Sequence, residues 1–388
     1  MRVLVIAPHP FYEERGTPIA VNLLLRALVE SGHDVEVLTL HLGRDVTLPS
    51  ERIHRIRPWF PIRHVPPGLS FPKIVCDFFL FWKFVGLMLR KRYDVVHAVE
   101  EASFMALAVC PLRSTPYIVD MDSLMSTQII DKFPQLRSLR PALAFLESLP
   151  IRRAEVVVPM CEALADEVKR FDPKRLVVLK DVSLRSEVPG GEAQAENLRE
   201  TLGIDGRLVL YIGNLEKYQG LDLLLGSFAL VRRELEDVHL VIIGGSESHI
   251  SRYRAEADRL GLGGYAHFPG PRPVSLLDAY LSQADVLVSP RVHGLNTPMK
   301  VYSYLDSGVA VLATDLPTHT QVMTRDTAAL AHPDEQSFAR EMLRLLADPA
   351  LRERLAANAR QLIEREHSYK AFKHSLGGIY QPLQSQGA

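Results

Sequence analysis

The sequence predicts two consecutive Rossmann-like α/β domains that face each other across a ligand-binding cleft. At 388 residues the chain is too long for one ordinary core and suits two domains. In both halves, short apolar runs alternate with segments of helical periodicity. This alternation is typical of a mainly parallel sheet covered on both faces. A stretch of Pro, Gly and small polar residues at 186–195 is the expected linker.

The first half begins with the apolar run 3–7, which predicts a buried parallel strand. A loop with Pro and Gly follows, and residues 18–30 carry apolar side chains at helical spacing until Gly32 ends the helix. We assign residues 1–185 to an N-terminal Rossmann-like domain. Its further strands are expected at residues 35–40, 94–99, 117–121, 156–160 and 176–179.

The same alternation restarts after the linker, and the end of the chain is strongly helical. We assign residues 196–366 to a C-terminal Rossmann-like domain and expect 367–388 to form a helix that packs back on the N-terminal domain. Ligands of doubly wound sheets lie outside the carboxyl ends of the strands, so the loops after strands are the candidate functional positions. Strands are expected at residues 208–212, 240–243, 286–289 and 310–314.

Composition is that of an ordinary globular enzyme, with 47% hydrophobic residues, 23% charged residues and a formal net charge of −1. This balance does not indicate a nucleic-acid partner. The three cysteines, Cys76, Cys110 and Cys161, are widely spaced and odd in number. They fit neither a disulfide framework nor a metal site, so we interpret them as reduced core residues. The chain starts with an apolar strand rather than a signal sequence, and we expect a cytoplasmic protein.

Residues 71–89 are rich in Phe and Leu and resemble a membrane span in composition. Lys73, Asp77 and Lys83 interrupt the segment, which leaves no clean apolar run of about 18 residues. We therefore do not predict a transmembrane helix.

The loop after the first strand contains Gly16, Thr17 and Pro18. Gly16 lets the backbone approach a ligand, Thr17 can cap the helix, and Pro18 suits its first turn. The free N–H groups of such a helix start favour an anion. The alternative is a capped helix after a turn. The glycine spacing does not match the dinucleotide-binding fingerprint.

The corresponding loop of the second half runs from Gly213 to Gly220. With a glycine at either end, it resembles the loop of the retaining GT-B glycosyltransferases of family 4. The resemblance implies that Gly213 and the residues after it meet the donor diphosphate. That family commonly has an Arg and a Lys where this chain has Asn214 and Gln219. Lys217 can supply a replacement charge, and the alternative for Lys217 is a solvated loop lysine.

The family places its donor-binding signature where this chain has residues 290–308, between two strands. The Asn-Thr-Pro-x-Lys pattern starting at Asn296 resembles a subset of the family. We expect Asn296 and Thr297 to cap a helix whose N–H groups face phosphate, with Gly294 in the loop before it. Arg291 and Lys300 are expected to neutralise the diphosphate. The alternative is a capped helix with two solvated basic groups.

The usual family signature contains two glutamates separated by seven residues, the second of which binds the ribose hydroxyls. Counting back from Gly308 places this second position at Ser303. A hydroxyl can still hydrogen-bond to ribose, although less strongly than a carboxylate. We therefore keep Ser303 as a candidate donor contact.

In the first half, Asp120 and Asp122 end a strand, and many relatives place a histidine near Asp122 that contacts the reacting sugar. We take Asp122 as the catalytic candidate, with an Asx-type turn as the alternative. The Asp-x-Asp spacing resembles a metal motif of a different glycosyltransferase fold, but a GT-B site does not depend on a metal, so none is expected. Glu100 and His97 also lie at a strand end.

Basic residues alternate with Trp59 and Phe60 over residues 52–64. Such a strip suits an anionic membrane surface, where each basic group contributes on the order of 1 kcal/mol. This favours a lipid-linked or membrane-proximal acceptor. The alternative is an edge strand followed by a core helix.

Taken together, the resemblance implies a metal-independent, retaining glycosyltransferase without a cofactor. It would move a sugar from a nucleoside-diphosphate sugar to a hydroxyl of a sugar, glycan or lipid-linked acceptor, on the inner face of the membrane if the strip binds there. Two alternatives stay open. One is a GT-B-shaped binding or partner subunit without catalysis, which the residues Asn214, Gln219 and Ser303 favour. The other is a different GT-B enzyme, a sugar epimerase or a phosphorylase.

Overall fold

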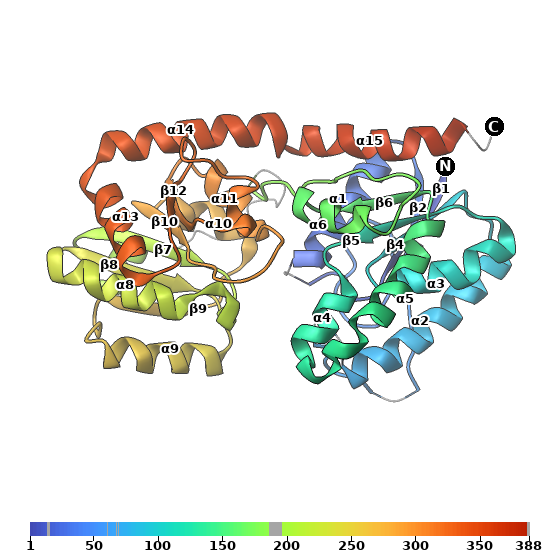
Figure 1. Cartoon of the computed structure of the whole chain (residues 1–388), viewed down its shortest axis with the longest axis horizontal. Coiled ribbons are helices and arrows are strands. Elements are labelled where there is room, and N and C mark those ends of the chain that lie inside the picture. The colour runs from blue at the N-terminus through green and yellow to red at the C-terminus, as the bar shows by residue number, and fades with distance from the viewer. Residues whose placement is uncertain (14–15, 60, 67, 69, 186–195, 386–388) are drawn as a thin grey trace. The chain divides into compact units, whose positions relative to one another are not determined.

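The computed structural model describes residues 1–13, 16–59, 61–66, 68, 70–185 and 196–385, so the expected linker at 186–195 and Phe60 of the basic strip lie outside it. The chain forms two compact units (Figure 1). One consists of Met1–Lys180 together with Lys373–Ala388, and the other of Asp181–Phe372.

The first unit contains a six-stranded sheet in the order β3-β2-β1-β4-β5-β6, and each neighbouring pair is parallel. Its strands are β1 (Arg2–Ala7), β2 (Asp34–Thr39), β3 (Ile53–Arg55), β4 (Val95–Val99), β5 (Tyr117–Met121) and β6 (Val156–Pro159). Its helices are α1 (Gly16–Glu30), α2 (Phe71–Arg90), α3 (Ala102–Val109), α4 (Met125–Lys132), α5 (Arg140–Arg153), α6 (Glu162–Lys169) and most of α15 (Tyr369–Ser385).

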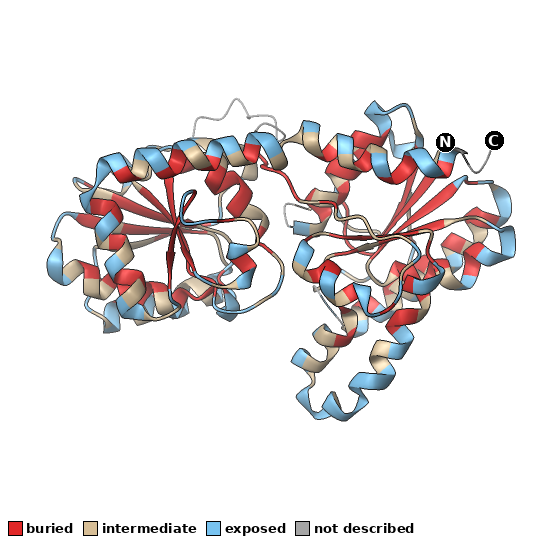
Figure 2. Ribbon diagram, turned by 45° about the horizontal axis from the view of Figure 1, so that its top comes forward, coloured by how far each residue is buried: buried red, intermediate tan, exposed pale blue. Residues whose placement is uncertain are grey.

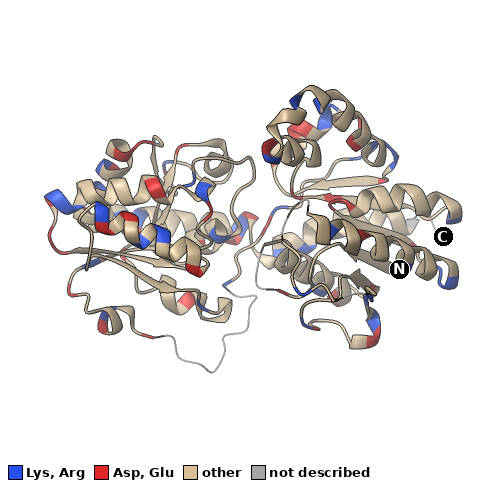
Figure 3. Ribbon diagram, turned by 90° about the horizontal axis from the view of Figure 1, so that it is seen from below, with Lys and Arg blue, Asp and Glu red and all other residues tan. Residues whose placement is uncertain are grey.

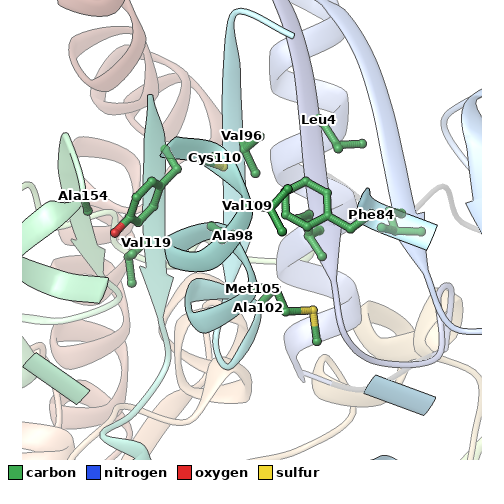
Figure 4. Close-up of a cluster of buried hydrophobic side chains, with 14 of the residues drawn as sticks. Leu4, Phe84, Val96, Ala98, Ala102, Met105, Val109, Cys110, Val119 and Ala154 are labelled. Atoms are coloured by element: carbon green, nitrogen blue, oxygen red, sulfur yellow. The ribbon is translucent and has the colours of Figure 1, made fainter. Parts of the chain in front are cut away.

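The core of the first unit forms because most residues of its strands are apolar and helices cover both faces of the sheet. Phe84 of α2 lies among Leu4 of β1, Val96 of β4 and Val109 of α3 (Figure 4). Burying one such side chain completely contributes about 1.5–3 kcal/mol. The cysteines are buried and free, which confirms the interpretation of Cys76, Cys110 and Cys161 as reduced core residues.

The second unit repeats the plan with the strand order β12-β11-β10-β7-β8-β9, again parallel throughout. Its strands are β7 (Arg207–Ile212), β8 (Val238–Ile243), β9 (Ala266–Gly270), β10 (Val286–Ser289), β11 (Ala310–Thr314) and β12 (Ala329–Ala331). Its helices are α7 (Leu198–Leu202), α8 (Leu221–Glu234), α9 (Glu247–Arg259), α10 (Leu277–Leu281), α11 (Met299–Asp306), α12 (Pro317–Thr320), α13 (Glu335–Ala347) and α14 (Pro349–Glu366).

Both sheets appear as bands of buried residues between helices with exposed outer faces (Figure 2). In the second unit, Phe228 of α8 and Phe338 of α13 belong to the cluster on one face of the sheet. Tyr302 of α11 and Ile363 of α14 belong to the cluster on the other. Basic and acidic residues are interspersed over both units (Figure 3). The predicted fold class of two doubly wound α/β domains is confirmed.

One predicted strand is wrong. Residues 176–179 form only an isolated parallel bridge between Val157 and Leu176, with hydrogen bonds from Val177 N to Val157 O (3.0 Å) and from Leu179 N to Pro159 O (3.1 Å). The segment thus lies beside β6 without forming a regular ladder. The edge strands β9 and β12 were not predicted, because β9 contains His, Pro and Gly and β12 has only three residues.

The alternative reading of residues 52–89 as an edge strand and a core helix is correct for β3 and for one face of α2. In the part of the chain that the structure describes, no helix is both long enough and apolar enough to cross a membrane. At the other end of the chain, α15 packs on the first unit, where Tyr380 Oη lies 2.8 Å from His97 Nδ1.

Candidate active site

Each sheet has a switch point, where the strands that follow in sequence change from one side to the other. These points lie between β1 and β4 and between β7 and β10. Ligands of open parallel sheets bind outside the carboxyl ends of the strands at such points. In the second unit, the loop 213–216 after β7 and the loop 290–298 after β10 occupy this position.

Lys300, in the first turn of α11, lies against the loop that follows β7. Its Nζ is 3.7 Å from the centroid of the Tyr211 ring and donates to Gln219 Oε1 at 3.2 Å. Gly213 leaves room for this side chain, since a Cβ there would lie 3.1 Å from Nζ. Three of the predicted donor contacts, Gly213, Gln219 and Lys300, therefore come together.

Arg291 follows β10 and is buried. Its Nε donates to His293 O at 2.8 Å and its Nη2 to Asn296 Oδ1 at 2.9 Å, while the guanidinium lies 5.2 Å from the Tyr218 ring centroid. Gly294 has a φ of +122°, and a Cβ there would lie 2.2 Å from Arg291 Nη2. Glycine at this position therefore allows the loop to fold closely around the guanidinium.

The electrostatics of these two cations favour an anionic ligand. Among the described residues, neither Arg291 nor Lys300 has a carboxylate partner. Burial and, secondly, the charge of Arg291 hold the pKa of Lys300 well below its usual value, and burial also lowers the pKa of Arg291. Two unit charges that lie about 4 Å apart near a protein surface attract or repel each other by roughly 4 kcal/mol. An anion that reaches both groups relieves their repulsion.

The predicted capping of α11 is wrong. Pro298 occupies the N-cap position, and no side chain caps the helix. Asn296 Oδ1 instead accepts from Arg291, and Thr297 Oγ1 accepts from Gln321 Nε2 at 2.9 Å. These side chains hold the loop, which leaves the first-turn N–H groups of α11 without a side-chain partner and suited to an anion.

Two other loop residues, unlike Arg291 and Lys300, are exposed. Lys217 is exposed at the start of the short 3-10 helix Lys217–Gln219. Asn214 is also exposed, with its carbonyl accepting from Tyr211 Oη at 2.6 Å and its Oδ1 from Glu216 N at 3.3 Å. Asn214 thus stabilises the loop, and Lys217 is not among the charges that the structure gathers.

Ser303 does not have the position that a ribose contact requires. It is fully buried on α11, and its Oγ accepts from Leu184 N at 3.1 Å. A hydroxyl with no exposed surface is not accessible to a ligand in this structure. The predicted contact of Ser303 with ribose is therefore corrected to an internal contact that holds α11 against the segment at Leu184.

Sequence reasoning missed the side chains that support the two cations. Tyr211 and Tyr218 provide the aromatic faces under Lys300 and Arg291. His319 is buried after β11, and its ring nitrogens lie 2.8 Å from Ser289 Oγ and 3.0 Å from Thr314 Oγ1. Burial lowers the pKa of His319 to about 3, so the ring adds no charge near neutral pH. The sequence offered one signal for this support, namely Tyr211, which lies near the end of a predicted strand and before the loop that starts at Gly213.

Gly220 fixes the approach of the two loops, and its replacement by Ala is expected to destabilise the protein by about 2–4 kcal/mol. Its φ is +75°, and a Cβ would lie 2.0 Å from Pro290 O. Chemical denaturation measures the loss. Gly261→Ala is the matched control, because Gly261 has a φ of +73° with no atom within 4 Å of its Cβ position. It should lose only about 1–2 kcal/mol, and equal losses in both variants would contradict the close approach.

In the first unit, Asp122 follows β5 and meets the start of α1. Thr17 Oγ1 donates to Asp122 Oδ2 at 2.7 Å, and Gly16 is exposed at the first position of that helix. Burial and the charge of Asp120 raise the pKa of Asp122 to about 6. Thr17 and Asp122 were both predicted as site residues, and the structure brings them together.

Two further acidic groups surround Asp122. Glu100, whose φ is +52°, accepts from Asp122 N at 3.2 Å, and burial together with the charge of Asp122 raises its pKa. Asp120 Oδ2 lies 3.1 Å from His97 Nε2, and Tyr380 of α15 holds the other ring nitrogen. In the described part of the chain, no group of three or more His, Cys, Asp or Glu residues is arranged to hold a metal ion.

Comparison with known protein families identifies both units. The Glycosyl transferases group 1 family matches residues 194–362, and the Glycosyl transferase 4-like domain matches residues 15–180. The chain belongs to the family 4 glycosyltransferases. The two matches together cover most of this glycosyltransferase.

Among curated relatives, the glycosyltransferase is 24% identical to a D-inositol 3-phosphate glycosyltransferase of Jonesia denitrificans, over 89% of this chain and 86% of the relative. It is also 24% identical to a phosphatidyl-myo-inositol mannosyltransferase of Mycolicibacterium smegmatis, over 47% of each chain.

Two solved structures share the fold of the glycosyltransferase. Sucrose-phosphate synthase of Thermosynechococcus elongatus aligns with a TM-score of 0.79 at 20% identity, over 99% of both chains. Anabaena HepE in complex with UDP-glucose aligns with a TM-score of 0.75 at 14% identity, over 98% of this chain and 100% of HepE. These similarities confirm the GT-B fold.

Proposed function

We propose that this glycosyltransferase uses a nucleoside-diphosphate sugar as donor and transfers the sugar to an acceptor hydroxyl with retention of anomeric configuration. The observation that carries the proposal is the pair of cations formed by buried Arg291 and half-buried Lys300, which have neutral neighbours and lie beside an uncapped helix start. A diphosphate supplies the negative charge that this arrangement lacks. The UDP-glucose complex of HepE supports the same class of donor.

The chemistry of the proposed step is electrostatic. The bond between the anomeric carbon and the diphosphate oxygen breaks while the acceptor oxygen bonds to the same carbon, and the acceptor proton passes to the departing phosphate. Negative charge grows on the diphosphate as its bond breaks. Arg291, Lys300 and the first N–H groups of α11 stabilise that charge, so the step requires neither a metal nor a cofactor. The two cations would take over the role of the family's Arg and Lys, which are Asn214 and Gln219 here.

In the first unit, Asp122 is proposed to accept a hydrogen bond from a hydroxyl of the reacting sugars. Its position after β5, with the hydroxyl of Thr17 fixing one carboxylate oxygen, supports this role. For the acceptor we propose a sugar, a glycan or a lipid-linked molecule. The names of the two curated relatives, which refer to inositol 3-phosphate and phosphatidyl-myo-inositol, support polyhydroxylated acceptors of both kinds. We further propose a cytoplasmic protein with peripheral contact to the inner face of the membrane.

The deciding experiment is a thermal-shift screen against UDP-, GDP-, ADP- and dTDP-sugars, followed by measurement of nucleotide release in the presence of a chelator. One donor class is expected to raise the melting temperature, since ligand at about 100 times Kd stabilises the folded state by about 2.7 kcal/mol. That donor should also release nucleotide with acceptor or water. No shift with any nucleotide sugar would contradict the proposal.

The same assay separates the second candidate function, a binding or partner subunit without catalysis. The absence of a carboxylate at Ser303 and the burial of that residue favour this candidate. Donor binding without transfer or hydrolysis would support it. Activity that requires inorganic phosphate would instead indicate a phosphorylase, and sugar release in the inverted configuration would contradict retention.

A further inference from the structure

The long helix α2 has two faces that are both apolar. One face, which includes Leu80 and Phe84, lies in the core of the first unit. On the other face, five residues each expose between 53% and 77% of their surface. Every exposed residue of the helix from its start to Leu89 is among these five, which are Phe71, Ile74, Phe78, Trp82 and Leu89.

The spacing of these residues places them along one side of the helix. Phe71 and Leu89 are separated by five full helical turns, and the others fall within about 60° of the same line. A surface helix normally presents charged residues on its outer side. Here the charged residues of the segment are engaged elsewhere: Lys73 pairs with Asp77 and Glu101, and Lys83 donates to Arg55 O.

Two neighbouring side chains extend this apolar surface. Trp59 is 89% exposed, and its ring centroid lies 5.5 Å from that of Phe79 on α2. Leu112 is 78% exposed, and the next residue, Arg113, donates from Nη2 to Leu89 O at 2.8 Å. We call these seven residues the α2 face: Trp59, Phe71, Ile74, Phe78, Trp82, Leu89 and Leu112.

Exposed basic residues border the α2 face. Arg57 and Arg63 lie in the segment that carries Trp59, and Arg90 and Arg113 lie at the C-terminal end of α2. Trp and Phe side chains prefer the boundary between the acyl chains and the headgroups of a bilayer, and arginines beside them are attracted to anionic headgroups. A helix with this pattern lies in the plane of the membrane surface.

We propose that the α2 face docks on an anionic lipid bilayer and holds the enzyme at the membrane. This inference rests on the proposed function, for which it supplies the surface that would bring the first unit to a lipid-linked acceptor. A second copy of the chain fits the face less well. In a two-fold symmetric contact the same patch meets itself, so its basic border would face an identical basic border.

The two tryptophans of the sequence, Trp59 and Trp82, both belong to the α2 face, which makes intrinsic fluorescence a direct probe. The full chain is mixed with phosphatidylcholine vesicles prepared with or without phosphatidylglycerol. We expect a blue shift of tryptophan emission, quenching by brominated acyl chains and flotation with the anionic vesicles, each weakened by added salt. Emission that stays unchanged with anionic vesicles would overturn the proposal.

The double variant Ile74→Ser/Phe78→Ser keeps both tryptophans and alters only exposed positions. It should reduce vesicle partitioning at least about tenfold. The control is Phe145→Ser/Leu146→Ser, which removes an equally exposed apolar pair from α5 and should leave partitioning unchanged. Equal partitioning of the Ile74/Phe78 variant and the wild type would also overturn the proposal.

Light scattering without lipid tests the alternative that a second copy of the chain covers the α2 face. A dimer that the Ile74→Ser/Phe78→Ser variant dissociates would show that the α2 face joins two copies, and would overturn membrane docking. The donor thermal-shift screen is read separately. Donor binding without vesicle binding removes only the membrane proposal, whereas vesicle binding without donor binding removes only the proposed function.

Discussion

Replacing Lys300 with Met is expected to lower kcat/KM for the nucleotide sugar by about 10²–10³, the usual cost of losing one preorganised group that stabilises transition-state charge. Met keeps an apolar stem of similar length but removes the charge that lies 3.7 Å from the Tyr211 ring centroid. The variant without ligand should be at least as stable as the wild type. A cation with a lowered pKa beside Arg291 opposes folding when no anion is bound. Steady-state kinetics and thermal denaturation, each with and without donor, measure both effects.

The matched control is Lys370→Met, at an exposed lysine of the second unit on α15. It should change neither kcat/KM nor the donor-induced rise in melting temperature. If Lys300→Met kept full activity and the full donor shift, Lys300 would not belong to the donor site. A large loss of stability without ligand would instead show that Lys300 acts through packing.

Replacing Asp122 with Asn is expected to lower kcat by about 10–10², which corresponds to the loss of one hydrogen bond to a charged group worth about 1.5–3 kcal/mol. The pKa of the carboxyl is raised to about 6, so the wild-type rate should rise with pH as Asp122 ionises through that value. The Asn variant cannot ionise and should lose this limb of the profile. Rate measurements between pH 5 and pH 8 at saturating donor and acceptor decide the point.

The same raised pKa has a consequence for stability. Between the ordinary aspartate value of 3.8 and about 6, the folded state of Asp122 binds more protons than the unfolded state. Stability therefore falls as pH rises through this window, by at most about 1.4 kcal/mol per pH unit for one proton. Asp122→Asn should reduce that slope, and Asp131→Asn, at an exposed position of α4, should not. Identical slopes in both variants would contradict the burial of a titrating group at Asp122.

The strands and long helices of this protein could be predicted because their signals are local. The apolar run of β1 and the helical periodicity of α1 lie within a few residues of each other, and their alternation along the chain indicates a parallel sheet. Elements with a weaker local signal were not predicted correctly. β12 has three residues, and residues 176–179 are apolar but form only an isolated bridge.

The candidate site divides in the same way. Loop position and residue type make Lys300, Arg291 and the glycines candidates for the site, because a parallel sheet gathers its strand ends at one edge. The partners of those residues were not predictable. Asn296 has the composition of a helix cap, yet its side chain binds Arg291, and the choice depends on a loop that Gly294 allows to close.

The sequence by itself determined the two doubly wound units and the positions of the loops that follow their strands, since periodicity and spacing are properties of neighbouring residues. Only the tertiary structure decided that Ser303 is buried against Leu184, that Thr17 meets Asp122, and that α2 presents apolar side chains on its outer side as well as to the core. Each of these depends on packing between segments far apart in the chain. Such packing decides which of several chemically competent groups is exposed, charged or already bonded.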